Sequence, residues 1–307
     1  MTATSTPQNL PISADHVRRQ FDRHARDTAG EFLHGEIANR MFDRLKLIRI
    51  QPETLLDAGC GIGHRTTALR NRFPAARLIS LDHNPRLLAL LRKTHQLDGL
   101  GQWIARLRNT SQHTTLCADL AATTLPAESL DLVWSNLALH WHPAPHAVIQ
   151  EWGRIIKPDG LAFFSCYGPG TGIELRHALA DADLKTATMP FVDMHDLGDM
   201  LVEHGFADPV MDQETLTLTY ASPEALINDV KLLGGNANPH RQPGLAGKGW
   251  INRLKRALQA QAGPDGRLKL TVEVSYGHAW RQAIRHQGTE TLISLHSLKR
   301  PSPPRQR

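Results

Sequence analysis

A glycine-rich turn after a short apolar run is the segment best suited to bind a ligand. Residues 57–63 read Asp-Ala-Gly-Cys-Gly-Ile-Gly, which places glycines at Gly59, Gly61 and Gly63. Glycine lacks a Cβ atom, so the backbone there can adopt positive φ angles and approach a ligand closely. The Asp57 carboxylate accepts hydrogen bonds and suits an amino group. A tight strand-to-helix turn without any ligand is the alternative.

A dinucleotide site is the competing functional interpretation, because its fingerprint G-x-G-x-x-G also follows a first strand. Two details oppose it. The third glycine would fall at position 64, where the chain has His64. The negative charge of Asp57 would repel a pyrophosphate, whereas it would attract an α-amino group. We therefore favour a ligand with a free amine.

Further candidate residues follow three other apolar runs. Asp82 ends one run, Asp119 and Leu120 follow a second, and Ser135 and Asn136 close a third. In open α/β sheets, ligands bind outside the carboxyl ends of the strands. Taken singly, each carboxylate could equally be a helix cap or a surface turn residue.

The pattern that positions them alternates short apolar runs with helical spacings, as in βα units. Strands are predicted at residues 54–58, 76–81, 114–118, 130–135, 161–166, 210–220 and 270–278. Helices are predicted at residues 13–27, 31–48, 63–72, 86–95, 144–156, 172–182, 193–204, 223–233 and 248–261. The fold class is therefore α/β: a doubly wound, seven-stranded Rossmann-like sheet with N-terminal helices and helical insertions after strands 5 and 6. The late sixth and seventh strands predict an antiparallel hairpin at one edge.

The same pattern divides the chain. We expect a mobile tail at residues 1–12, a helical lid at 13–50 and a cofactor-binding core at 51–168. A part with substrate-side helices and closing strands follows at 169–298, and a basic mobile tail at 299–307. The middle three form a single domain, residues 13–298. Residues 99–111 are an insertion before the third strand.

Composition excludes several classes of protein. With 41% hydrophobic residues the chain can bury a core, yet it has no apolar stretch of the roughly 20 residues that cross a bilayer. The chain starts without a basic and apolar leader, so we expect a cytoplasmic protein. Its three cysteines, Cys60, Cys117 and Cys166, lack the spacing of a metal site. The formal net charge of +5 permits an acidic partner, but we see no RNA-binding motif and expect no nucleic acid or membrane.

Taken together, the strand ends resemble the class I S-adenosylmethionine-dependent methyltransferases, whose motif E/D-x-G-x-G-x-G corresponds to residues 57–63. The resemblance implies S-adenosylmethionine as cofactor, with Asp82 binding both ribose hydroxyls. Asp119 and Leu120 would lie beside the adenine. The segment from Ser135 and Asn136 to residue 141 would line the pocket mouth.

Over residues 17–281, approximately, the chain is most similar to the malonyl-[acyl-carrier protein] O-methyltransferases of biotin biosynthesis. The segments that carry this likeness are residues 134–141, 164–171, 191–199 and 276–280. The likeness implies methylation of the free carboxylate of a malonyl thioester on an acyl-carrier protein. One departure is Thr28, which stands seven residues after Phe21, where the family commonly has a Tyr.

The implied acceptor needs orientation rather than activation. A malonyl carboxylate has a pKa of about 4 and is ionised at neutral pH, so no catalytic residue is required as a general base. Hydroxyl, imidazole or guanidinium groups could orient it. Our candidates are His140, Tyr167 and Arg23, and each could instead be purely structural.

A basic segment offers a surface for an acidic carrier. Residues 231–269 contain eight Lys and Arg residues against one acid, Asp265. An acidic carrier protein would be steered to such a surface. We expect contacts with Lys248, Arg253, Lys255 and Arg256, and the alternative is a solvated helix face.

Two other functions stay open. A methyltransferase of another small molecule, such as a quinone precursor, would keep the cofactor motif but would not need the basic segment. A non-catalytic accessory protein on the same fold would be expected to lose Asp57 or Asp82, and both are present.

Overall fold

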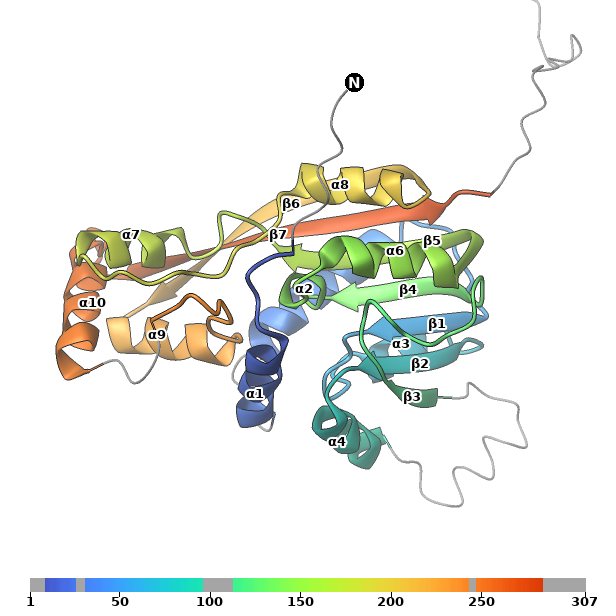
Figure 1. Ribbon diagram of the computed structural model, residues 1–307, viewed down its shortest axis with the longest axis horizontal. Coiled ribbons are helices and arrows are strands. Elements are labelled where there is room, and N and C mark those ends of the chain that lie inside the picture. The colour runs from blue at the N-terminus through green and yellow to red at the C-terminus, as the bar shows by residue number, and fades with distance from the viewer. Residues whose placement is uncertain (1–8, 26–30, 96–112, 243–246, 284–307) are drawn as a thin grey trace, which may run out of the picture.

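A seven-stranded sheet forms the centre of the computed structural model, which describes residues 9–25, 31–95, 113–242 and 247–283 (Figure 1). The strands are β1 Thr54–Ala58, β2 Arg77–Asp82, β3 His113–Cys117, β4 Leu130–Asn136, β5 Ile156–Tyr167, β6 Phe206–Tyr220 and β7 Leu268–Arg281. Their order across the sheet is β3-β2-β1-β4-β5-β7-β6. β1 to β5 are parallel, whereas β7 runs antiparallel to β5 and β6. The predicted sheet and its edge hairpin are confirmed.

The strand order reverses between β1 and β4. From β1 the chain moves outward to β2 and β3, then returns to place β4 on the other side of β1. Such a reversal opens a crevice at the carboxyl ends of the two strands. Asp57 and Asn136 lie at these ends.

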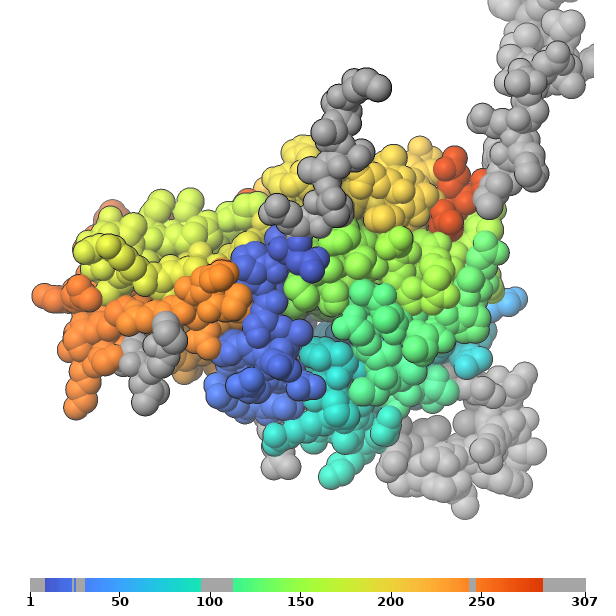
Figure 2. All heavy atoms as spheres, viewed as in Figure 1, coloured from blue at the N-terminus to red at the C-terminus, as the bar shows by residue number. Residues whose placement is uncertain are grey.

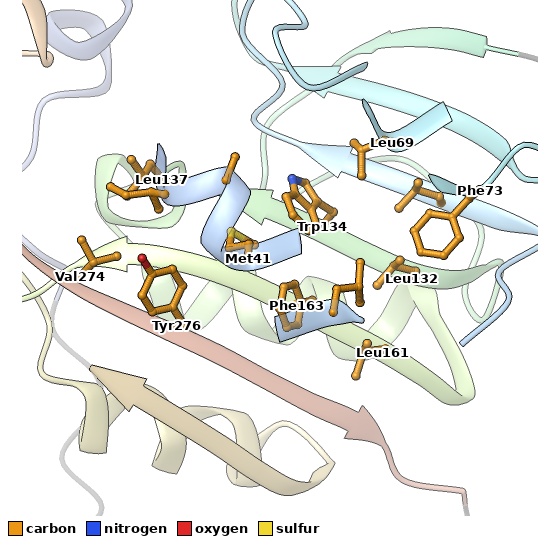
Figure 3. Packing of buried hydrophobic residues seen from close by; sticks show 14 of the residues in the cluster. Met41, Leu69, Phe73, Leu132, Trp134, Leu137, Leu161, Phe163, Val274 and Tyr276 are labelled. Carbon is orange, nitrogen blue, oxygen red and sulfur yellow. The ribbon is translucent and has the colours of Figure 1, made fainter. Parts of the chain in front are cut away.

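Helices cover both faces of the sheet. They are α1 Ala14–His24, α2 Glu31–Leu45, α3 Thr66–Arg72, α4 Pro85–His95, η1 Leu139–Trp141 (a 3₁₀ turn), α6 Pro145–Ile155, α7 Ile173–Asp181, α8 Met194–Glu203, α9 Pro223–Leu232 and α10 Lys248–Ala260. α2 and α3 pack on one face around the buried rings of Trp134 and Phe163 (Figure 3). α6 and α8 pack on the other face around Trp152 and Phe164. Because both faces are covered, β1, β2 and β4 are almost entirely buried, which explains their continuous apolar runs.

The long strands β6 and β7 continue beyond this core and carry α7, α9 and α10 (Figure 1). A separate cluster of buried residues, including Leu179, Leu226 and Leu258, holds this extension together. In Figure 2, α1 in blue lies between the extension and the core strands. The predicted helical insertions after strands 5 and 6 are thus present, and α7, α9 and α10 form one unit.

Two boundaries differ from the prediction. The helix expected from residue 63 begins at Thr66, because Gly63 has a φ of 81°, outside the helical region. Leu10 and Ile12, expected in a mobile tail, contact the folded chain. The Leu10 N–H donates to the Pro143 carbonyl at 2.7 Å, and Ile12 is 7% exposed. These two residues pack against the folded chain because burial of their apolar side chains is favourable.

Some expectations fall on residues outside the described ranges. These are residues 1–8 of the first tail, the insertion at 99–111 and the second tail at 299–307. We propose that the lid, the core and the substrate-side part form a single domain, since the core and the substrate-side part share one sheet and the lid packs on it. Among the described helices, none is long and apolar enough to cross a membrane.

Replacing Gly277 of β7 by Ala should destabilise the fold. A Cβ atom there would lie 2.4 Å from Cζ of Phe164 and 2.9 Å from Sδ of Met211. Overpacking of this kind costs about 1 to 3 kcal/mol, and chemical denaturation should show a loss of that size. Gly249→Ala on α10 is the control, because a Cβ there meets nothing within 4 Å. Equal losses in both variants would contradict the packing explanation.

Candidate functional site

A pocket lies at the carboxyl ends of β1, β2 and β4, beneath α1 and α2. Of the residues predicted to bind the cofactor, those that line it are Asp57, Gly59, Gly61, Asp82, Asp119, Leu120 and Asn136. Gly63 and Ser135 do not line it. Segments far apart in the sequence therefore meet where the strand order predicts.

The glycine-rich turn forms one wall of the pocket. Gly59 has a φ of 80°, and a Cβ atom there would lie 2.2 Å from Cβ of Ala138, so only glycine fits. Gly61 has a φ of 56° and faces open space, and its N–H donates to Oδ2 of Asp82 at 2.9 Å. Gly63 instead packs beneath the turn against α4, which explains its absence from the lining.

Two buried carboxylates stand beside this turn. Asp57 is 4% exposed, and its burial, together with the negative charge of Asp82, raises its pKa to about 7. Burial also raises the pKa of Asp82, which accepts hydrogen bonds from the backbone N–H groups of Gly61 and Asn84, each at 2.9 Å. Buried negative charge is costly without a positive partner. The pair therefore suits a ligand that brings a positive charge and hydrogen-bond donors.

The rest of the predicted lining follows β3 and β4. Asp119 is half exposed, and its carboxylate lies 3.1 Å from Nε2 of His142. Asn136 donates to the backbone carbonyl of His34 on α2 at 3.2 Å. Ser135 is fully buried, and its hydroxyl donates to the Ala58 carbonyl at 3.0 Å. Ser135 therefore joins β4 to β1 behind the pocket.

α1 covers the pocket with its apolar side. Val17 and Phe21 are one turn apart and both line the pocket. The Phe21 ring meets the ring of Trp141, from the predicted pocket mouth, edge-on at 5.4 Å between centroids. Asp22 accepts a hydrogen bond from Nδ2 of Asn84 at 2.9 Å, which ties α1 to the turn after β2.

A polar cluster where α2 faces the glycine-rich turn was missed from the sequence. Glu31 accepts a hydrogen bond from Arg65, and its second oxygen lies 3.3 Å from Nε2 of His64. His34 also lines the pocket, and burial together with nearby His64 lowers its pKa to about 4. A partial signal existed, because His64 and Arg65 directly follow the turn, but nothing local indicated their pairing with α2.

Two of the three acceptor candidates lie together beside a second, narrow pocket. The rings of His140 and Tyr167 are 4.5 Å apart between centroids, and Nδ1 of His140 accepts the backbone N–H of Tyr167 at 3.3 Å. Burial lowers the pKa of His140 to about 3, so the ring is neutral with its proton on Nε2. Among the described residues, neither this Nε2 nor the Tyr167 hydroxyl has a hydrogen-bond partner. Arg23 lines neither pocket, because α1 turns it outward into solvent.

The basic candidates lie on α10, at the end of the extension. Lys248, Arg253 and Arg256 are exposed, whereas Lys255 pairs with Glu224 of α9 at 2.9 Å. No residue of α10 lines the first pocket. The basic helix and the acidic pocket are therefore separate surfaces.

The first pocket is strongly acidic. Glu31, Asp57, Asp82 and Asp119 line it, and among the described lining residues only Arg65 has a permanent positive charge. Such a lining attracts a cation and disfavours a pyrophosphate. Within the described ranges, no group of three His, Cys, Asp or Glu side chains could hold a metal ion.

Asp57→Asn should stabilise the ligand-free protein at neutral and higher pH. Burial gives the folded carboxyl a pKa of about 7, above the value of about 4 in an unfolded chain. Stability is therefore lost as the pH rises from about 4 to about 7, and Asn removes this loss. Urea denaturation should show a gain of about 2 kcal/mol or more near pH 8 that shrinks toward pH 5. Asp43→Asn on the exposed side of α2 is the control, and an equal gain from Asp57→Asn at both pH values would contradict the raised pKa.

Comparisons with known proteins agree with this geometry. A family described as a methyltransferase domain matches residues 56–164. Curated proteins named malonyl-[acyl-carrier protein] O-methyltransferase are 43% identical in Laribacter hongkongensis and 41% identical in Gallionella capsiferriformans. The matches cover 88% and 89% of this chain and 90% and 93% of those proteins.

A solved structure shares the fold. It is Haemonchus contortus phosphoethanolamine N-methyltransferase 2 in complex with S-adenosyl-L-methionine, with a TM-score of 0.52 and 16% identity over 87% of this chain and 60% of that one. That likeness shows the fold alone, whereas the 43% and 41% identities over nearly the whole chain show the family. The chain belongs to the malonyl-[acyl-carrier protein] O-methyltransferases, a family of methyltransferase enzymes.

Proposed function

We propose that the protein transfers the methyl group of S-adenosylmethionine to the free carboxylate of a malonyl thioester on an acyl-carrier protein, as a step of biotin biosynthesis. The observation that carries the proposal is the acidic pocket at the strand-order reversal, with Asp57 and Asp82 beside the glycine-rich turn. The names of the curated relatives support this acceptor. The free thiols of Cys60, Cys117 and Cys166 fit a cytoplasmic protein.

The lining fits the chemistry of this cofactor. Asp57 would accept from the α-ammonium group, and its pKa would then fall because the positive charge favours the ionised form. Oδ2 and Oδ1 of Asp82 accept the backbone N–H groups of Gly61 and Asn84, and a carboxylate has about four lone-pair sites, which leaves capacity for ribose hydroxyls. Asp119 and Leu120 would lie beside the adenine, with the backbone at Gly59 and Gly61 along the methionine part. Gly63, Ser135 and Asn136 would position these residues through the contacts described above.

The chemical step demands positioning more than proton transfer. The bound cofactor supplies a methyl group on a positively charged sulfonium, ready for in-line displacement. The acceptor carboxylate is already ionised, so no side chain acts as a general base. Holding the reacting atoms in line can lower the barrier by about 7 to 11 kcal/mol. The rings of Phe21 and Trp141 meet above the pocket, and exclusion of water by them would favour a reaction that neutralises two charges.

His140 and Tyr167 are our candidates for orienting the acceptor. Each offers one buried donor, the Nε2–H and the phenolic O–H, without a partner among the described residues. Two neutral donors suit a carboxylate, because hydrogen bonds to a charged acceptor are the stronger ones. The rings of His140 and Trp141 are 5.0 Å apart between centroids, which places His140 directly behind a residue of the cofactor pocket. Arg23 is not retained, since it is exposed on α1.

Incubation of malonyl-carrier protein with the enzyme and S-adenosylmethionine should produce a mass gain of one methylene on the carrier. Acetyl-carrier protein is the matched control, because it lacks the free carboxylate and should gain nothing. Intact-protein mass spectrometry measures both. If the malonyl carrier stays unmodified while S-adenosylmethionine binds, the acceptor is wrong and another small molecule, such as a quinone precursor, takes its place.

The carrier would dock on α10 and its neighbours. Exposed Lys248, Arg253 and Arg256 lie on this helix, and Arg267 and Lys269 are exposed at the start of β7. Carrier proteins of acidic surface would be steered there by complementary charge. Leu232, the last residue of α9, lines the cofactor pocket, so the extension reaches from the basic helix to the site.

Reversing Arg253, Lys255 and Arg256 to Glu should lower kcat/KM for the carrier substrate, mainly through association. Added salt should lower the wild-type value in the same direction, because it screens the attraction. Malonyl-coenzyme A, if accepted, should respond less, since its charged portion is smaller. A triple reversal on the opposite edge of the sheet, at Arg77, Arg92 and Lys93, controls for net charge. A carrier reaction that is unchanged at low salt would place docking elsewhere, such as near Arg18 and Arg19.

A further inference from the structure

One charge of the proposed cofactor still lacks a partner. S-adenosylmethionine carries an ammonium, a sulfonium and a carboxylate, and the acidic groups Asp57, Asp82 and Glu31 would repel the last of these. We propose that the guanidinium of Arg65 binds the carboxylate of the cofactor's methionine part. The inference rests on the cofactor site proposed above.

Arg65 stands where the glycine-rich turn passes into α3. It is the residue directly before Thr66, it lines the pocket, and its side chain is 22% exposed. The guanidinium lies directly against α2, because a Cβ atom at Gly35 would be 3.4 Å from Nη2 of Arg65. The cation is thus held between the turn and the helix that closes the pocket.

Arg65 is the lining residue whose charge can pair with an anionic group of the ligand. Among the described residues that line the pocket, it alone is permanently positive. His34 is neutral at pH 7, because burial lowers its pKa to about 4. Nε2 of His64 lies 3.3 Å from the same carboxylate of Glu31, on the α2 side of the turn.

The geometry of the guanidinium permits two anionic partners. Arginine presents five N–H donors in a planar fork that matches a carboxylate. Arg65 donates to Glu31 through Nη2. Partial burial lowers the pKa of Arg65, which reflects a cation with little solvent around it. A second carboxylate from the pocket side would compensate that charge and would fix the methionine part at both of its polar ends.

The test compares S-adenosylmethionine with its decarboxylated form, which keeps the ammonium and the sulfonium and lacks the carboxylate. Calorimetry at about pH 7 measures both affinities, because the α-ammonium group of the cofactor is mostly protonated there. Arg65→Gln should weaken S-adenosylmethionine roughly ten- to hundredfold, the usual worth of hydrogen bonds between charged groups, and should leave the decarboxylated form within about threefold. Arg65→Lys should keep part of the preference for the carboxylate. Arg72→Gln, at the last residue of α3 and outside the pocket, should change neither affinity.

Failure of the Arg65 inference and failure of the cofactor site would give different results. If Arg65→Gln weakens both ligands equally, Arg65 only shapes the pocket through Glu31, and the inference is overturned. The inference is also overturned if neither affinity changes, or if the wild type does not prefer the carboxylated form. If the wild type binds neither compound, the cofactor site itself is misplaced and the inference falls with it. Melting curves establish that each variant is folded. If Arg65→Gln does not fold, the affinities of Arg65→Lys for the two ligands test the inference instead.

Discussion

The carboxylate of Asp82 holds together the parts of the site that come from different places in the sequence. One oxygen accepts the N–H of Gly61 and so sets the glycine-rich turn after β1. The other accepts the N–H of Asn84 and so sets the turn into α4. Asn84 in turn donates to Asp22 of α1. The wall of the pocket and the helix that covers it therefore depend on one buried acid at the end of β2.

This arrangement places negative charge where the fold would be more stable without it. Asp57 and Asp82 are both buried, and burial raises the pKa of each. A cationic ligand would compensate this buried negative charge. Sites of this kind trade stability for binding, as functional sites commonly do. The same charge also discriminates among nucleotides, since a pyrophosphate would add repulsion where a sulfonium and an amine find attraction.

The extension formed by α7, α9 and α10 is suited to recognition of a protein partner. α1 covers the pocket with apolar side chains, but the acceptor is proposed to arrive on a protein. β6 and β7 are longer than the other strands and extend beyond them. On this extension α7, α9 and α10 form a second packed unit with its own apolar cluster. Basic side chains lie at its outer end on α10, while the end of α9 borders the pocket. Recognition of a large partner and exclusion of water can thus be carried by different surfaces of one sheet.

Local sequence was enough for the elements and for the position of the pocket. Apolar runs identified the strands, and the resemblance to the methyltransferases assigned the polar residues at their ends to one cofactor pocket, which the strand order does bring together. Other decisions needed the tertiary structure. Ser135 and Asn136 are neighbours, yet successive strand residues point to opposite sides, so one bonds β1 and the other lines the pocket. Arg23 and Phe21 share a helix, and only packing on the core decided which of them faces inward. The pairing of Glu31 with Arg65 joins residues 34 positions apart, and no local pattern encodes a contact that exists only once α2 has packed against the turn.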